Sequence, residues 1–172
     1  RQAFCASPQC SPSRASLLTG QWAHNTGMLG LAHIGWKLAD PGQHLLYTLR
    51  GADYYSALSG MQHVAEKPED VGYDAVIGGI DDAEQRAVEF LNHPPSQPFF
   101  LNVGFVETHR IGEGFSPPLK GQEPADGRYT RPPATLPDTP ETRRDMAEFV
   151  DTASRLDRRT GVVLDALESA GL

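Results

Sequence analysis

The segment from Cys10 to Gly20 places a thiol, an arginine and helix-start residues at a spacing that could build an anion site. Pro12 and Ser13 are typical of the beginning of a helix, and Gly20 is typical of its end. A side chain at a helix N-terminus meets free backbone N–H groups and the positive end of the dipole, so anions bind there and thiols ionise more easily. Arg14 adds a permanent positive charge. The alternative is an ordinary buried cysteine, which is inert.

Two histidines follow apolar segments that are expected to be strands. His63 comes after Tyr55–Leu58, and His109 comes after Phe99–Phe105. Sites in parallel α/β sheets gather at the carboxyl ends of strands, so both imidazoles are candidates for proton transfer near neutral pH. The alternatives are a loop histidine bound to backbone and a histidine that caps a strand end. His24 follows the motif helix closely and is a weaker candidate for lining the same pocket, with packing as an equal alternative.

The pattern Cys-x-Pro-Ser-Arg-x-x-x-Leu-Thr-Gly is complete from Cys10 to Gly20 and resembles the modification motif of the type I sulfatase family. The resemblance implies that a maturation enzyme oxidises Cys10 to formylglycine. The aldehyde would then hydrate, one hydroxyl would attack the sulfur of a sulfate ester, and the second hydroxyl would help to expel sulfate. Arg14 would hold the formylglycine and neutralise nearby negative charge.

The same resemblance gives roles to both strand-end histidines. His63 would hydrogen-bond a formylglycine hydroxyl and act as a base, and His109 would contact the sulfate or protonate the leaving oxygen. The sequence departs from the family pattern at two positions, because Met61 replaces a lysine that contacts sulfate and Thr108 replaces a proline. Loss of one pre-organised donor commonly lowers a rate by about two to three orders of magnitude. Met61 therefore keeps an inactive homologue among the alternatives.

The resemblance also implies one calcium ion, bound by an acidic pair before the cysteine motif and by an Asp-Asn or similar pair after it. Calcium takes several oxygen ligands, mainly carboxylates and amides. Within this chain the only ligand that the resemblance identifies is Cys10, as formylglycine, and the remaining ligands are expected outside the chain. Asp81-Asp82 is an acidic pair, but it opens a helix and stands in the wrong order, so no metal role is assigned to it.

Apolar spacing, proline and glycine predict the remaining elements. We expect helices at residues 44–50 and 81–92, strands at 53–59 and 98–105, and a long helix from Thr139, with Pro140 as its first residue, to the end. Residues 106–138 are rich in proline and glycine and are predicted to form an ordered loop that closes over a site. The alternation predicts an α/β fold with a mixed, largely parallel sheet and flanking helices. The resemblance implies the alkaline-phosphatase-like sulfatase fold, here incomplete.

The resemblance further implies that residues 1–172 are a partial sulfatase catalytic domain, an internal segment with both ends of the domain absent. Glu107 and Arg110 flank His109, and contact with a sugar hydroxyl or carboxylate is an alternative to solvent exposure, which is the default expectation. Five arginines are expected on the solvated face of the last helix: Arg143, Arg144, Arg155, Arg158 and Arg159.

Composition excludes several other classes. The chain has 172 residues, 39% of them hydrophobic, and a net charge of -7, which argues against a nucleic-acid binder with a basic face. No apolar run approaches the length that spans a bilayer. Cys5 and Cys10 are too few for a disulfide framework and lack the Cys-x-x-Cys spacing of a thiol redox site.

The resemblance therefore predicts hydrolysis of sulfate esters or sulfamates on a sulfated sugar or another sulfated small molecule. The sulfamidase and heparan-type branch of the family is the most similar. The expected partners are that substrate and the formylglycine-generating maturation enzyme. The alternatives are a phosphonate or phosphate monoester hydrolase of the same superfamily and a catalytically inactive truncated homologue. The compartment stays open, with export implied by resemblance alone.

Overall fold

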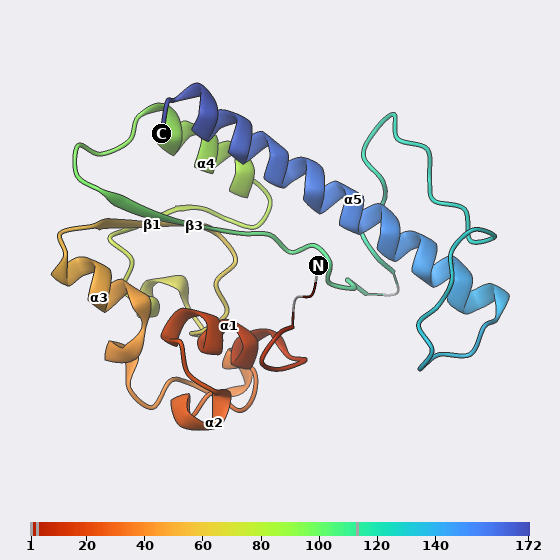
Figure 1. Cartoon of the computed structure of the whole chain (residues 1–172), viewed down its shortest axis with the longest axis horizontal. Coiled ribbons are helices and arrows are strands. Elements are labelled where there is room, and N and C mark those ends of the chain that lie inside the picture. The colour runs from red at the N-terminus through yellow and green to blue at the C-terminus, as the bar shows by residue number, and fades with distance from the viewer. Residues whose placement is uncertain (1, 3, 113) are drawn as a thin grey trace. The chain divides into compact units, whose positions relative to one another are not determined.

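A computed structural model describes residues 2, 4–112 and 114–172 as two units, residues 1–104 and residues 105–172. The described part of the first unit has a sheet of order β2-β1-β3 with parallel pairing: β1 (Tyr55–Gly60), β2 (Ala75–Gly78) and β3 (Phe99–Gly104). Figure 1 shows α4 (Ala83–Asn92) on one side of β1 and β3, with α1 (Cys10–Thr19) and α3 (Leu45–Gly51) on the other. The predicted α/β fold with a parallel sheet and flanking helices is confirmed.

Short helical segments connect these layers and support the core of the first unit. They are α2 (Ala23–Thr26) and the 3-10 helices η1 (Ala32–Ile34), η2 (Pro41–Gln43) and η3 (Pro68–Val71). One buried apolar cluster gathers side chains from α1, α3 and these connections: Ala15, Met28, Leu38, Leu46, Val64 and Val71. Burial of this cluster fixes α1 against the loops that follow it, because apolar burial is the main stabilising contribution in a small domain.

Strand β2 was absent from the elements expected from the sequence. A segment of four residues is too short to show a periodic pattern of apolar residues, and none of the β2 residues is fully buried. Asp74, directly before the strand, accepts hydrogen bonds from the backbone N–H and the hydroxyl of Ser56 at 2.8 and 2.6 Å. This side-chain clamp holds the beginning of β2 beside the beginning of β1, a long-range contact that no local signal reveals.

The motif helix begins at Cys10, two residues earlier than Pro12 and Ser13 suggest. Gln9 precedes it with extended backbone and no side-chain cap, and the Ser13 N–H donates to the Gln9 carbonyl at 3.1 Å. Pro12 is tolerated because a first-turn residue needs no intrahelical N–H donor. Gly20 ends the helix with a φ of 68°, as predicted.

The carboxyl ends of β1 and β3 approach each other very closely. A Cβ placed on Gly104 would lie 1.8 Å from the carbonyl oxygen of Met61, and one placed on Gly60 would lie 2.0 Å from the carbonyl oxygen of Gly104. The obstacles are backbone atoms, which cannot rotate away. Glycine at both positions is therefore what allows the chain after β1 to turn beside β3.

Replacing Gly104 by alanine is expected to lower the free energy of unfolding by about 3 kcal/mol, because the added methyl group must displace the Met61 peptide. Urea unfolding measures the loss. Gly161→Ala is the matched control, since its Cβ meets nothing within 4 Å inside a helix, and it should stabilise by about 0.5–1 kcal/mol. Equal effects of the two substitutions would contradict the close approach.

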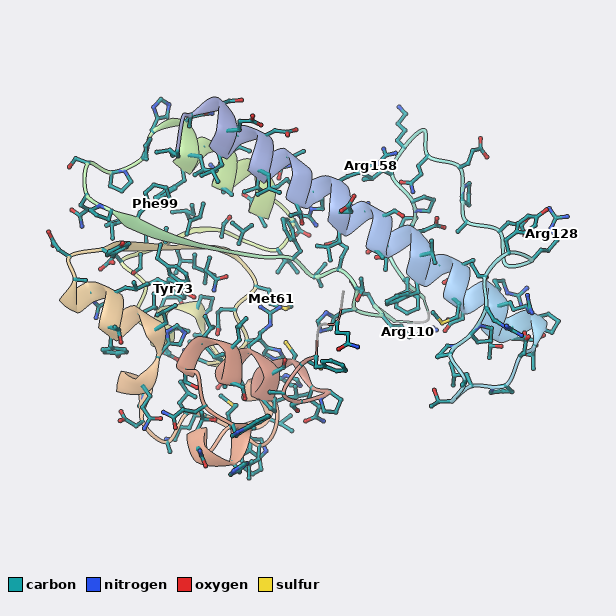
Figure 2. All side chains as sticks on the ribbon, in the orientation of Figure 1. Met61, Tyr73, Phe99, Arg110, Arg128 and Arg158 are labelled. Carbon is teal, nitrogen blue, oxygen red and sulfur yellow. The ribbon has the colours of Figure 1, made fainter. Side chains whose placement is uncertain are left out.

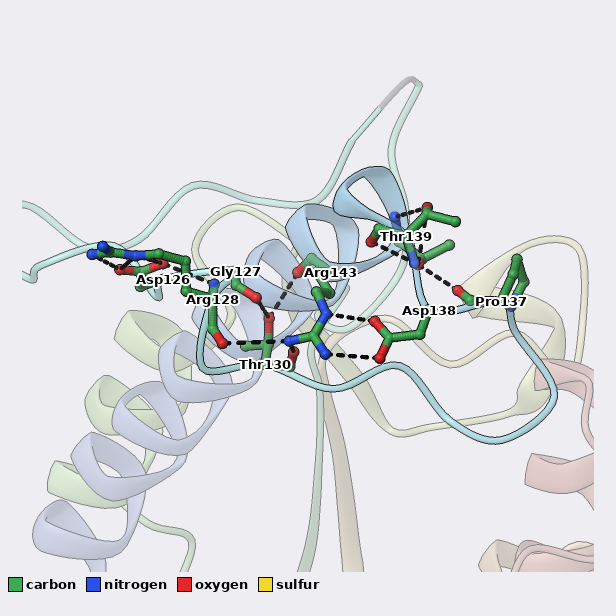
Figure 3. A network of polar contacts seen from close by, with 9 residues as sticks. Asp126, Gly127, Arg128, Thr130, Pro137, Asp138, Thr139 and Arg143 are labelled. Atoms are coloured by element: carbon green, nitrogen blue, oxygen red, sulfur yellow. Dashed lines mark hydrogen bonds and ion pairs between the residues drawn. The ribbon is translucent and has the colours of Figure 1, made fainter.

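The second unit pairs a long loop with helix α5 (Pro140–Ser169), which runs through Gly161 without a break. Thr139 caps the helix and exchanges hydrogen bonds with Thr142, and Pro140 takes the first position. Figure 3 shows how the loop is tied to this helix start. Arg143 binds both carboxylate oxygens of Asp138, at 2.5 and 2.7 Å, and its carbonyl accepts from the Thr130 hydroxyl at 2.8 Å.

Side-chain contacts with α5 hold several of the loop residues that the structure describes. Besides the Arg143 contacts, the Ala125 N–H donates to the buried carboxylate of Asp151 at 2.9 Å. Such bonds give hydrogen-bond partners to backbone groups of the loop that would otherwise pack against the helix without one. Whether the loop closes over a site stays a prediction.

Among the described residues, no helix is long and apolar enough to cross a membrane.

The expectation that Glu107 and all five arginines are solvated is wrong for Glu107 and Arg159. The Glu107 side chain is 1% exposed and the Arg159 side chain 8% exposed, and Arg159 NH1 donates to both Glu107 oxygens at 2.9 Å. Arg155 Nε adds a third bond at 2.8 Å. The guanidinium of Arg159 also lies over the Phe105 ring, 4.8 Å from its centroid. The sequence did not predict this cluster, because acidic and basic residues alternate along α5 with the same spacing whether the ion pairs they form are solvated or buried.

Candidate active site

The Cys10 sulfur, at the first position of α1, is contacted by two basic side chains. Nε of Arg14 donates to Sγ at 3.1 Å, and Nδ1 of His63 lies 3.1 Å from the same sulfur. All three residues are half-buried. Arg14 reaches back one helical turn, whereas His63 arrives from the loop after β1. Of the four predicted catalytic residues, these three are brought together.

Arg14 is held at both ends of its guanidinium. Nε bonds the sulfur, and NH1 donates to the carbonyl of Met61 at 3.3 Å. Figure 2 labels Met61 between the sheet and α1, where this contact joins the motif helix to the end of β1. A fixed guanidinium presents its remaining N–H groups in a rigid fork, which suits a tetrahedral oxyanion.

His63 is presented by a tight turn after β1. Its φ is 62°, a left-handed conformation that is uncommon for residues other than glycine and that Asn, Asp and His adopt more often than the rest. Buried Gln62 stabilises the turn: its side-chain oxygen accepts from the N–H groups of Val64 and Ala65 at 2.5 and 3.0 Å, and its amide donates to the Ala65 carbonyl at 2.7 Å. Non-glycine residues held at positive φ cluster at functional sites.

A cavity of about 560 Å³ opens at the carboxyl ends of β1 and β2. Met61 and His63 line it on one side, and the segment from Val76 to Ile80 lines it on the other. Ligands of α/β folds bind at this edge of the sheet, so the cavity lies where a substrate is expected. His63 therefore both contacts the Cys10 sulfur and lines this cavity, whereas Cys10 and Arg14 are not among its lining residues.

His33 is a neighbour of the candidate site that the sequence did not reveal. Its Nδ1 lies 2.9 Å from Nε2 of His63, on the opposite side of that ring from the nitrogen facing Cys10. The available signal was a histidine between Gly30 and Gly35 in the connection that follows the motif helix. That signal is weak, because glycine-flanked polar residues are common in ordinary loops.

The other two candidates, His109 and His24, are exposed within their own units. His109 is exposed in the second unit, with its Nδ1 2.9 Å from the carbonyl of Val106, which matches the strand-end alternative. His24 is exposed in α2, and no hydrogen bond between it and Cys10 is present among the described residues. Their assigned roles in substrate contact stay predictions.

The half-buried side chain of Tyr73 lies near enough to Arg14 for the charge of Arg14 to affect the pKa of the Tyr73 phenol. Burial raises its pKa, while the hydrogen bond from Asn102, at 2.6 Å, and the charge of Arg14 lower it only in part. The phenol is therefore neutral near pH 7 and is not a nucleophile.

His44 lies next to Tyr73 and is buried at the beginning of α3, where its Nδ1 accepts a hydrogen bond from the Leu46 N–H. Burial lowers the pKa of this imidazole.

The side chains around Cys10 do not form a calcium site. Among residues 2, 4–112 and 114–172, no group of three or more His, Cys, Asp or Glu side chains is arranged to hold a metal ion. The neighbours of the Cys10 sulfur are a guanidinium and an imidazole, which are not the oxygen ligands that calcium takes.

Comparison with known proteins points to one family. The profile of the family described as Sulfatase matches residues 1–172. Human N-sulphoglucosamine sulphohydrolase is 30% identical over 202 residues, an alignment covering 100% of this chain and 40% of that protein. N-acetylgalactosamine-6-sulfatase of Sus scrofa is 36% identical over 76 residues, covering 38% of this chain and 15% of that protein.

A solved structure has the same fold. A candidate sulfatase from Bacteroides thetaiotaomicron superimposes with a TM-score of 0.66 at 19% identity, covering 98% of this chain and 47% of that one. The chain therefore spans less than half the length of the solved structure and of the human relative that it matches.

Proposed function

The chain belongs to the sulfatase family, and on that premise we propose that its parent protein, the natural gene product containing this chain, hydrolyses sulfate esters or sulfamates. The observation that supports the proposal best is the pair of contacts on Cys10, where Arg14 Nε and His63 Nδ1 both lie 3.1 Å from the sulfur. A nucleophile held between a fixed cation and a potential base is suited to attack on a sulfuryl group.

We infer that Cys10 is the residue converted to formylglycine. The hydrated aldehyde supplies a hydroxyl nucleophile and a second hydroxyl that helps to expel sulfate. The surroundings of Cys10 fit that group, because a hydroxyl near the sulfur position has a donor in Arg14 and a proton acceptor in His63. Arg14 holds residue 10 and offsets negative charge, and His63 accepts a proton at Nδ1.

The names and lengths of the relatives support proposals for the substrate class and for the extent of the domain. The human relative is named for N-sulphoglucosamine and the porcine relative for a 6-sulfated N-acetylgalactosamine. We propose a sulfated sugar as the substrate, and residues 1–172 as part of a longer catalytic domain, since the human relative is much longer than this chain.

His109 and His24 are proposed substrate contacts. Calcium ligands other than residue 10 would lie outside residues 1–172.

A paired assay on the purified parent protein tests the reaction class. An aryl sulfate, an N-sulfated glucosamine and an aryl phosphonate monoester are compared after co-expression with a maturation enzyme. Faster turnover of either sulfur substrate supports the proposal. Turnover of the phosphonate alone would favour the other hydrolase class of the superfamily, and no turnover of any substrate would favour an inactive homologue.

Met61→Lys is expected to raise turnover of the parent protein about tenfold or more, because it would add a cation beside the developing charge. Met61 is half-buried and lines the cavity shared with His63, so a lysine there can reach the substrate side. Steady-state kinetics with the aryl sulfate measure the gain. Met61→Leu is the control and should leave turnover unchanged; an unchanged rate with lysine would mean that another cation, such as Lys67, already serves.

A further inference from the structure

The loop that carries His33 is anchored to the motif helix. The N–H of Ala32 donates to the hydroxyl of Ser11 at 3.0 Å, and both residues are almost fully buried. Gly35 then ends η1 with a φ of 96°, its N–H bonded to the Ala32 carbonyl at 3.0 Å. Because Ser11 adjoins Cys10 and Ala32 adjoins His33, the position of His33 is coupled to that of the nucleophile residue.

The two imidazoles lie edge to edge in nearly one plane. Their planes differ by 10°, their centroids are 5.1 Å apart, and Nδ1 of His33 lies 2.9 Å from Nε2 of His63. Rings stacked face to face would keep their atoms at least about 3.5 Å apart, so the 2.9 Å contact is an in-plane hydrogen bond. His33 is exposed, whereas His63 is half-buried.

A hydrogen bond between two neutral imidazoles contains one hydrogen atom, which fixes the tautomers of both rings. If Nε2 of His63 carries it, Nδ1 of His63 has its lone pair facing residue 10 and can accept a proton. If Nδ1 of His33 carries it, His63 must be protonated on Nδ1 and cannot act as a base. The hydrogen-bond partner of Nε2 therefore decides whether His63 can act as a base at Nδ1.

We propose that His33 is a positioning residue that accepts the hydrogen bond from Nε2 of His63 and so keeps the His63 Nδ1 lone pair directed at residue 10. This rests on the proposed function for its catalytic consequence, but not for its geometry. When Nδ1 of His63 takes the hydroxyl proton, His63 becomes an imidazolium and its bond to His33 becomes charge-assisted, which stabilises the protonated ring. No proton needs to leave the pair for this effect.

The first test is the tautomer of His63 in the parent protein with Cys10 unconverted. Two-bond ¹H–¹⁵N NMR spectra of histidine-labelled protein at about pH 8, where an ordinary imidazole is neutral, report which nitrogen carries the hydrogen. A His63→Asn spectrum identifies the signals. We expect Nε2–H in the wild type, a mixture of tautomers in His33→Ala, and recovery in His33→Gln, whose amide oxygen can accept the bond. An unchanged tautomer in His33→Ala would overturn the proposal.

The second test is kinetic. Loss of a group that orients a functional side chain commonly lowers activity about 10-fold to 100-fold, so His33→Ala should lower kcat by that factor with little change in KM, and His33→Gln should recover part of it. His93→Ala, at an exposed histidine that ends α4, is the control. Equal kcat in His33→Ala and wild type would refute the positioning role. If the wild type turns over nothing, the proposed function fails while the tautomer spectra still decide the role of His33.

Discussion

His63→Asn is expected to lower kcat of the parent protein by about 100-fold to 10,000-fold, the range for loss of a general acid or base. Its Nδ1 is the imidazole nitrogen that contacts the Cys10 sulfur, at 3.1 Å. Asparagine is the informative replacement, because it tolerates the left-handed conformation that His63 adopts at a φ of 62°. The variant should therefore fold at least as stably as the wild type, and its loss of turnover would report chemistry alone.

The matched control is His93→Asn, which makes the same chemical change at an exposed position. Steady-state kinetics with the aryl sulfate and thermal unfolding are measured on all three proteins. Unchanged turnover in His63→Asn would exclude His63 as the base. A large loss of stability in the same variant would show instead that the turn after β1 requires histidine for structural reasons.

Glu107→Gln is expected to destabilise the parent protein by about 3–5 kcal/mol, because it removes the negative charge that compensates the buried guanidinium of Arg159. The amide keeps the shape of the carboxylate, so the loss reports charge rather than packing. Urea unfolding measures the change. Glu123→Gln, at an exposed glutamate of the same unit, should stay within about 0.5 kcal/mol of wild type. Equal effects at the two positions would contradict the buried cluster.

The same pair predicts a pH dependence with a definite sign. Burial alone would raise the pKa of Glu107, but its own backbone N–H, Arg159 and Arg155 outweigh burial and hold the pKa below the ordinary 4.5. A carboxyl with a lowered folded-state pKa stabilises the protein above its unfolded pKa and loses that contribution in acid. The difference between wild type and Glu107→Gln should be full near neutral pH and shrink as the pH falls below 4.5.

Local signals predicted most of the first unit correctly. The motif helix, its end at Gly20, the two longer strands and the helix before Pro94 depend on proline, glycine and apolar spacing, which act within a few residues. The contacts of Arg14 and His63 on Cys10 were expected from resemblance to a family rather than from spacing. Only the fold could show that residues 53 positions apart meet at 3.1 Å.

The features that the sequence did not reveal all depend on long-range contacts. Strand β2 exists because Asp74 is clamped by Ser56, and Glu107 is buried because two arginines about fifty residues later turn toward it. His33 reaches His63 through a loop that Ser11 anchors. Charged and polar residue types carry no local record of such partners, so they look like surface residues until the chain is folded.

The conversion of Cys10 is the most direct measurement of the central claim. Trypsin should release residues 2–14, a peptide that contains both Cys5 and Cys10, so exposed Cys5 serves as an internal thiol standard. After co-expression with a maturation enzyme, a hydrazide probe and mass spectrometry should find an aldehyde at residue 10 and a free thiol at residue 5. A free, alkylatable thiol at Cys10 in protein that hydrolyses the sulfate substrate would contradict the proposed mechanism.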